Sequence, residues 1–208
     1  MNHKIIITIA RQYGSGGRAI GQKLADHLGI PFYDKELIQL AAKDSGIDKG
    51  LFENADETHT STFWNTMSIN TNVFGNRITA FNDIPMNDKL FLIQSNIIKK
   101  VANEGSCVIV GRCADYILRE EQNTVHVFIH SNAEDKLHRI INNYNIPESN
   151  AKDIMIKTDK KRSTYYNYYS DGKWGRAENY DLSINSGAVG IDGAIKIIKE
   201  FAVIKLGI

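Results

Sequence analysis

Short apolar runs alternate with amphipathic stretches along most of the 208-residue chain. The runs have the length and β-branched content of buried strands, and most are separated by segments with one apolar face at helical spacing. This alternation predicts an α/β protein with a parallel sheet covered by helices. The predicted strands are 4–10, 31–33, 107–110, 124–130 and 180–185, and the predicted helices are 19–28, 35–45, 89–104, 133–143 and 192–201.

Two long stretches interrupt this alternation. The first, 48–88, is rich in Asn, Thr and Ser with scattered aromatic residues, and the second, 148–179, combines lysines and arginines with tyrosines. Long connections in a compact domain are usually functional lids, binding loops or disordered segments. We therefore predict one domain, 1–208, with two mobile insertions.

Composition narrows the possible partners. The chain is 42% hydrophobic, enough for a core of its own, and its 25 basic and 24 acidic residues leave a net charge of +1. This balance argues against the broad electrostatic attraction used by proteins of nucleic acid or anionic membranes. The N-terminus reads directly into a strand without a signal-like segment, so we expect a cytoplasmic protein. Cys107 and Cys113 lack metal-ligand spacing and are expected to be buried free thiols. The oligomeric state stays open.

A glycine-dense turn follows the first predicted strand. Gly14, Ser15, Gly16 and Gly17 let the backbone turn tightly and aim N–H groups inward, and the next helix presents its positive end. This arrangement is typical of a phosphate-binding loop. The usual P-loop pattern has lysine and then serine or threonine after its last glycine, whereas here Gly17 stands at the lysine position and Arg18 at the hydroxyl position.

In our interpretation Arg18 restores the missing positive charge. Its guanidinium can grip phosphate oxygens at two places, although it supplies no hydroxyl to magnesium. A cation at the positive end of a helix is unfavourable without an anion, which favours a phosphate-binding role over a solvated arginine. The alternative for the glycines is a tight strand-to-helix turn with no ligand.

Charged residues also follow two other predicted strands, at the edge where ligands of open α/β sheets bind. Asp34 follows the second predicted strand and could orient an acceptor, hold metal-bound water or cap the next helix. Arg112 follows the third, beside a glycine, and Asp115 could anchor that arginine or contribute to magnesium binding. A surface salt bridge is the alternative for the pair.

The second insertion concentrates positive charge. We interpret it as a closing lid in which Arg162 and Arg176 reach a transferring phosphoryl group. Lys160 and Lys161 fit a solvated face equally well. The same mixture of basic residues and tyrosines suits single-stranded RNA, but the near-zero net charge argues against that partner.

Several segments together resemble one family. They are Arg-Gln-Tyr-Gly-Ser-Gly-Gly-Arg at 11–18, Pro-Phe-Tyr-Asp-Lys-Glu-Leu-Ile at 31–38, Val-Ile-Val-Gly-Arg-Cys-Ala-Asp at 108–115, Asp-Lys-Lys-Arg at 159–162 with Tyr-Tyr at 165–166, and Tyr-Asp-Leu-Ser-Ile-Asn-Ser at 180–186. As a set they resemble the cytidylate kinase-like branch of the nucleoside monophosphate kinases, over nearly the whole chain.

The resemblance implies a P-loop NTPase three-layer fold with a mainly parallel five-stranded sheet. Within it, 48–88 would be the acceptor-binding region and 148–179 the lid. It further implies transfer of the γ-phosphoryl group of ATP, with Mg²⁺ as cofactor, to CMP or dCMP. The partners would then be ATP and a nucleoside monophosphate.

The residues and the resemblance together give roles to the candidate residues. Donor phosphates would be bound by Gly14, Ser15, Gly16, Gly17 and Arg18, the catalytic cations would be Arg18, Arg112, Arg162 and Arg176, and the acceptor would be bound by Asp34, Arg112 and Asp115, with Asp34 and Asp115 as magnesium ligands. Asn185 begins a loop that lies against the donor base in this family, although a plain glycine-rich turn explains that segment equally well.

Two further functions fit the same sequence. The scaffold could phosphorylate a different small acceptor, because a P-loop fold does not fix its acceptor. A nucleotide-binding sensor that lost turnover together with the P-loop lysine is the alternative outside catalysis.

Overall fold

The computed structural model describes residues 4–34 and 85–207. The chain divides into two compact units, one formed by residues 1–34 and 98–208 and the other by 35–97. The predicted helix 35–45 and most of the insertion 48–88 lie outside the described residues. Helix α4 (Met86–Glu104) begins in the second unit and continues into the first. A single domain with insertions therefore stays a prediction.

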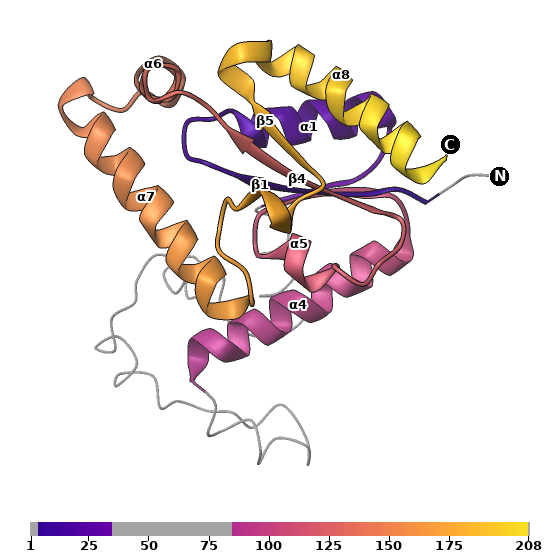
Figure 1. Cartoon of the computed structure of the whole chain (residues 1–208). Coiled ribbons are helices and arrows are strands. Elements are labelled where there is room, and N and C mark those ends of the chain that lie inside the picture. Colours follow the sequence, from indigo (N-terminus) through magenta and orange to yellow (C-terminus); the bar gives the residue numbers. More distant parts are fainter. Residues whose placement is uncertain (1–3, 35–84, 208) are drawn as a thin grey trace. The chain divides into compact units, whose positions relative to one another are not determined.

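Five parallel strands form the sheet of the first unit, in the order β2-β3-β1-β4-β5 (Figure 1). The strands are β1 (Ile6–Arg11), β2 (Phe32–Tyr33), β3 (Cys107–Val110), β4 (Thr124–His130) and β5 (Leu182–Asn185). The α/β prediction is thus confirmed, with every strand pair parallel. Ile9 in the central strand β1 pairs with Val110 on one side and Val127 on the other. Because the strands are parallel, all their carboxyl ends meet at one edge.

Helices cover both faces of this sheet, with α1 and α8 on one face and α5 on the other (Figure 1). The helices of the first unit are α1 (Gly17–Leu28), α5 (Ala114–Ile117), α6 (Ala133–Tyr144), α7 (Glu148–Tyr169), the short 3₁₀ helix η2 (Ala177–Asn179) and α8 (Ser186–Leu206). Gly29, with a φ of 63°, ends α1 as the sequence predicts.

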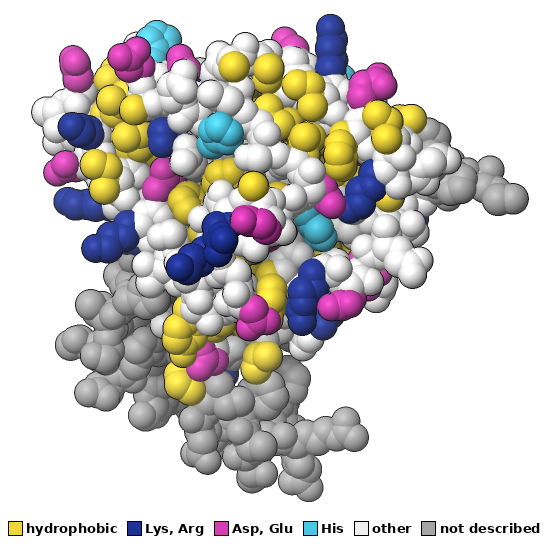
Figure 2. Space-filling model, viewed as in Figure 1, with side chains coloured by type: hydrophobic (Ala, Val, Ile, Leu, Met, Phe, Trp, Pro, Cys, Tyr) yellow, Lys and Arg dark blue, Asp and Glu magenta, His cyan; other side chains and the backbone are white. Residues whose placement is uncertain are grey.

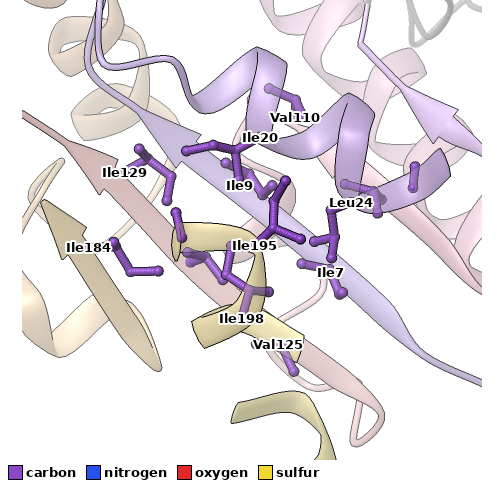
Figure 3. Close-up of a cluster of buried hydrophobic side chains, with 14 of the residues drawn as sticks. Ile7, Ile9, Ile20, Leu24, Val110, Val125, Ile129, Ile184, Ile195 and Ile198 are labelled. Carbon is purple, nitrogen blue, oxygen red and sulfur yellow. The ribbon is translucent and has the colours of Figure 1, made fainter. Parts of the chain in front are cut away.

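The main core lies between the sheet and helices α1 and α8 (Figure 3). Successive side chains of a strand point to opposite faces, so Ile7 and Ile9 enter this core while Thr8 and Ala10 face the other way. The strands contribute Val108, Val110, Val125, Val127, Ile129 and Ile184, and the helices contribute Ile20, Leu24, Ile195 and Ile198. This packing fixes the starting point of every loop at the carboxyl edge.

The end of the chain differs from the prediction in its boundaries. Strand β5 begins at Leu182 rather than at residue 180, because Tyr180 ends η2 and packs its ring 5.0 Å from that of Phe128. Both cysteines are buried, which confirms their prediction as buried thiols.

Helix α8 begins at Ser186, six residues earlier than predicted. Asn185 caps it, since the Asn185 side chain accepts a 3.0 Å hydrogen bond from the backbone N–H of Gly187. The helix then bends at Gly190, whose φ of 70° is a left-handed conformation that glycine adopts without strain. The segment expected as a glycine-rich loop is therefore the first turn of a bent helix.

The basic insertion is mainly helical. Helix α7 occupies residues 148–169 and packs Ala151 and Met155 against Ile140 of α6. Lys160 and Lys161 are exposed, so they form the solvated face that was one of their two predicted roles. On the face that Figure 2 shows, basic and acidic side chains are interspersed. Within 4–34 and 85–207, no helix combines the length and apolarity needed to cross a bilayer.

His126 is a partly buried ionisable side chain on β4. Its Nδ1 lies 2.8 Å from the Thr8 hydroxyl across the β1–β4 pair, and burial lowers the pKa of His126 to about 4. The nearby Asp181 carboxylate opposes that shift and the Lys205 ammonium adds to it. The folded protein therefore excludes a proton that the unfolded chain binds below about pH 6.5.

The first prediction follows from this pKa. The stabilisation from neutral His126 is complete above about pH 6.5 and is lost as the pH falls towards 4, by about 3 kcal/mol in all. We expect the difference in unfolding free energy between wild type and His126→Asn to shrink by that amount between pH 7 and pH 4. Urea unfolding across this range measures it, with the exposed His138→Asn as the matched loss of an imidazole. Parallel profiles for wild type and His126→Asn would contradict the assignment.

Candidate functional site

The glycine-dense turn connects β1 to α1 at the carboxyl edge of the sheet. Gly14 and Gly16 have φ values of 77° and 78°, which strain any other residue. Neighbouring atoms also occupy the space that a side chain would need at these two positions. A β-carbon on Gly14 would lie 2.8 Å from the Lys136 carbonyl oxygen, and one on Gly16 would lie 2.6 Å from Ile191 Cδ1. Helices α6 and α8 therefore pack directly against the loop.

Hydrogen bonds hold the loop in one conformation. The Ser15 hydroxyl donates to the Gln12 carbonyl at 2.8 Å, and the Ser186 hydroxyl donates to the Ser15 carbonyl at 2.6 Å. Arg139 of α6 donates from Nη1 to the Gly14 carbonyl at 2.6 Å. Since these carbonyls are bound from outside, the loop can turn its N–H groups towards a ligand. Helix α1 starts at Gly17 with Gly16 as its N-cap, so the cap has no side chain to satisfy the first N–H groups.

A charged cluster from α6 and α7 supports the same loop. Asp159 accepts a 2.6 Å hydrogen bond from the Tyr13 backbone N–H. Lys136, which is mostly buried, donates to the Gln12 side-chain oxygen at 3.1 Å and lies 3.7 Å from the Asp159 carboxylate. Burial raises the pKa of Asp159, although the Tyr13 N–H and the charges of Arg162 and Lys136 oppose that shift. The loop is therefore tied to both helices through one ion-paired network.

Asp34 brings two arginines together beside the loop. Arg18 Nε lies 2.7 Å from Asp34 Oδ2, and Arg11 Nη2 lies 3.6 Å from Asp34 Oδ1. The Arg18 guanidinium also lies over the Phe32 ring, 5.6 Å from its centroid. Each carboxylate oxygen of Asp34 thus faces a different guanidinium, and Asp34 orients both cations.

Arg162 reaches this group from α7. Its Nη1 donates to the Arg11 carbonyl at 3.0 Å and lies 4.0 Å from the Asp159 carboxylate. Burial lowers the pKa of Arg162, and the charges of Asp159 and Asp34 counteract that shift. Of the basic run on α7, the arginine turns inward to the loop while its two lysine neighbours face solvent.

Arg112 lies in a strained turn after β3. Gly111, Arg112 and Cys113 have consecutive φ values of 84°, 59° and 55°. A left-handed conformation costs a non-glycine residue about 1–2 kcal/mol, so the fold holds Arg112 in a disfavoured backbone state at the ligand edge. The Arg11 guanidinium occupies the space that a β-carbon on Gly111 would need. Arg11 and the Arg112 turn are therefore immediate neighbours.

Two predicted site residues, Arg176 and Asn185, make their described contacts with other residues. Arg176 is 60% exposed and pairs with Glu178 at 3.3 Å on the surface. Asn185 caps α8 and donates to Asn132 Oδ1 at 3.2 Å. The structure thus places four predicted site residues at one edge of the sheet: Arg18, Asp34, Arg112 and Arg162. Among the described contacts, none joins Arg176 to this group.

Asp115 lies in a buried aromatic network. It is 5% exposed, and its carboxyl group accepts a hydrogen bond from the Tyr166 hydroxyl of α7. Its Oδ2 has no hydrogen-bond partner among the described residues. Burial raises the pKa of Asp115 to about 6, against the effect of Tyr166 and two backbone N–H groups. Burial also raises the pKa values of Tyr166 and Tyr180, the latter being packed on Phe128.

The described residues do not fit a magnesium ion held by the protein. Magnesium requires near-octahedral oxygen ligands at about 2.0–2.1 Å. Asp34 is paired with two arginines, Asp115 is hydrogen-bonded to Tyr166, and position 18 offers no hydroxyl. Across 4–34 and 85–207 no three His, Cys, Asp or Glu residues gather into a possible metal site. Asp34 and Asp115 as magnesium ligands stay a sequence prediction that this arrangement does not favour.

Several residues of the site were not predicted from the sequence. They are Arg11, Lys136, Arg139 and Asp159. The spacing of charged residues could have indicated some of them. Lys136 and Arg139 are three residues apart on one helix face, and so are Asp159 and Arg162. Arg11 was marked only by its place at the start of the loop.

Solved structures share this fold. The chain is similar, with 14% identity, to shikimate kinase from Bacteroides thetaiotaomicron, over 96% of this chain and 98% of that one, with a TM-score of 0.54. It is also similar, with 14% identity, to shikimate kinase from Acinetobacter baumannii in complex with shikimate, over 97% and 94% of the two chains, with a TM-score of 0.52. The protein therefore has a P-loop kinase fold of the α/β class.

The family is defined by the sequence. The model of the cytidylate kinase-like family matches residues 6–188, and the chain belongs to this family. An uncharacterized protein from Eubacterium ventriosum is 32% identical over 96% of this chain and 98% of its own, with a TM-score of 0.72. Comparison with curated proteins finds no match. The family and the fold define a kinase-like protein.

The second prediction concerns Asp115. Because its folded pKa lies above the ordinary value, its stabilisation is complete below about pH 4 and is lost as the pH rises through 6, a difference of about 3 kcal/mol. We expect Asp115→Asn to gain about that much unfolding free energy relative to wild type between pH 4 and pH 8. Urea unfolding at each pH tests this, with the exposed Asp171→Asn as the control for removing a carboxylate. A pH-independent difference would show that Asp115 does not titrate in this range.

Proposed function

We propose that the protein is a nucleoside monophosphate kinase that transfers the γ-phosphoryl group of ATP to CMP or dCMP. The observation that carries the proposal is that Arg18, Arg162 and the turn that carries Arg112 lie beside a supported glycine loop at one edge of the sheet. Phosphoryl transfer is catalysed mainly by positioning and by neutralising charge, and these residues supply both. Cytosine as the acceptor base rests on the family alone.

The proposed roles follow the position of each element. The N–H groups of the loop and the start of α1 bind the donor phosphates, which replace the missing side-chain cap with an anion. Arg112, held at the end of β3, binds the phosphate of the acceptor. Arg162 approaches from α7 and stabilises charge on the transferring group. Asp34 keeps Arg18 oriented before substrate binds.

The reaction balances without a proton acceptor. A phosphate oxygen of the monophosphate attacks the γ-phosphorus, and the bond from that phosphorus to the β–γ bridging oxygen breaks. ADP leaves with the electron pair of that bond, and the monophosphate becomes a diphosphate. The chain therefore needs cations and exclusion of water more than a general base.

A second candidate is transfer to a different small acceptor. The favouring observation is the fold itself, which is shared with a shikimate kinase solved in complex with shikimate. Shikimate is not a nucleotide, so one scaffold accommodates unrelated acceptors. The predicted base-contacting segment, 48–88, lies almost entirely outside the described residues. A nucleotide sensor is less well supported, because binding alone does not require Arg112 and Arg162 at the same edge.

The third prediction tests the proposed kinase. Arg112→Asn removes the guanidinium and suits the left-handed backbone at this position. We expect transfer from magnesium-ATP to CMP or dCMP to fall by about 100-fold or more, as for the loss of a charge-stabilising donor, with ATP affinity nearly unchanged. Phosphorus NMR over a panel of monophosphates and shikimate measures the transfer.

Arg119→Asn serves as the matched control, because Arg119 lies after α5, over the Tyr116 ring. Equal losses of transfer and ATP binding in Arg112→Asn would contradict the acceptor role. Transfer to shikimate but to no nucleotide would favour the second candidate. ATP binding without transfer to any acceptor would favour a sensor.

A further inference from the structure

Two positions of the phosphate loop depart from the P-loop pattern together. The pattern begins with glycine, continues through four residues to a second glycine, and then has lysine. When Gly16 is aligned with the second glycine, Arg11 stands at the first glycine and Gly17 at the lysine. The loop therefore has a long cationic side chain where glycine is expected and glycine where the long cationic side chain is expected.

These two positions are in contact. A β-carbon on Gly17 would lie 2.5 Å from Arg11 Cβ and 3.0 Å from Arg11 Cγ. It would also lie 3.3 Å from Cβ of the buried Ile129 in the neighbouring strand. Atoms attached to a backbone cannot move far to relieve such contacts, so no side chain fits at position 17 while Arg11 is present. The stem of Arg11 fills the space beside Gly17.

The end of the Arg11 side chain lies at the carboxyl edge of the sheet, beside Asp34 and the turn after β3. Its guanidinium is 3.6 Å from the Asp34 carboxylate and packs against Gly111, before the Arg112 turn. The side chain is 19% exposed, against 53% for Arg18. A cation that is largely shielded from water interacts more strongly with an anion than an exposed one. The Asp34 carboxylate orients the Arg11 guanidinium, and Arg162 holds the Arg11 main chain by donating to its carbonyl oxygen.

We propose that Arg11 replaces the P-loop lysine and binds the β- and γ-phosphates of the nucleoside triphosphate. This inference rests on the proposed function for its substrate and changes the role of Arg18. Arg11 is the phosphate-binding cation, and Arg18 is a positioning residue that holds Asp34 from the solvent side. A guanidinium has five donors in a planar fork, so Arg11 can bind phosphate oxygens while keeping its contact with Asp34.

The exchange of the two residues provides the test. Arg11→Gly removes the proposed cation, and we expect about 10- to 100-fold weaker binding of ATP with little change for AMP, which lacks the β- and γ-phosphates. Gly17→Lys alone introduces the clash and is expected to lower the melting temperature. The double variant R11G/G17K restores glycine at the first position and lysine after the second glycine, with Arg18 unchanged, and is expected to recover both ATP affinity and folding. Isothermal titration with ATP, ADP and AMP measures binding, and thermal unfolding monitors the fold.

The double variant separates a phosphate-binding role from a structural one. If Arg11 only supported Asp34, a lysine at position 17 would not restore ATP affinity to R11G. Arg11→Ala is a second variant that keeps a β-carbon in strand β1, in case glycine there destabilises the strand. Arg119→Gly is the control for loss of an arginine away from the site. Unchanged ATP affinity in both R11G and R11A, or no recovery in a folded double variant, would overturn the proposal.

The two proposals fail differently. A wild-type protein that binds ATP in an Arg11-dependent manner but transfers phosphate to no acceptor would overturn the kinase and leave Arg11 as the phosphate-binding cation. A wild-type protein that transfers phosphate equally well as R11G would overturn the role of Arg11 and leave the kinase. Failure of the wild-type protein to bind ATP would overturn both.

Discussion

The pairing of β1 with β3 and β4 in parallel is the constraint on which the site depends. Because Ile9 pairs with Val110 and Val127 at the same time, the ends of three strands are held at one height. The loop after β1, the Arg112 turn after β3 and the start of α6 after β4 are therefore neighbours, and their direct contacts build on this arrangement. The branched side chains under α1 and α8 maintain this register, since a slip would move the buried face of each strand to the other side (Figure 3).

At this edge, the conformation of the glycine loop is held mainly by residues of other elements. Gly14 and Gly16 have no room behind them, and the carbonyl groups of the loop are taken by Arg139, Ser186 and the loop's own Ser15. Helix α7 adds Asp159 and Arg162, which bind the backbone of Tyr13 and Arg11, so the element that carries the proposed catalytic cation also holds the loop. Buried charge is costly unless it is paired, and the network of Lys136 and Asp159 satisfies this condition.

The sequence was most informative where a local pattern decides the structure. Hydrophobic alternation predicted the strands and most helices, and the glycine cluster predicted the loop with its flanking elements. Helix α8 was misjudged because glycines that suggest a loop can also allow a bend, and the cap at Asn185 was not recognised. The partners of the arginines could not be predicted, because each pair joins segments far apart in the chain, such as Arg11 with Asp34 and Arg162 with Arg11.

The contact between the Arg11 stem and Gly17 links two positions in the history of the loop. A single substitution from an ordinary loop, with glycine first and lysine seventh, leads either to both long side chains, which collide, or to glycine at both places, which removes both cations. The reverse path from this chain meets the same two intermediates. Each position therefore decides whether a change at the other is tolerated, and a substitution that is harmless in one relative is harmful in another. An evolutionary barrier therefore separates the two loop chemistries, even though exchanging the cation between them involves only positions 11 and 17.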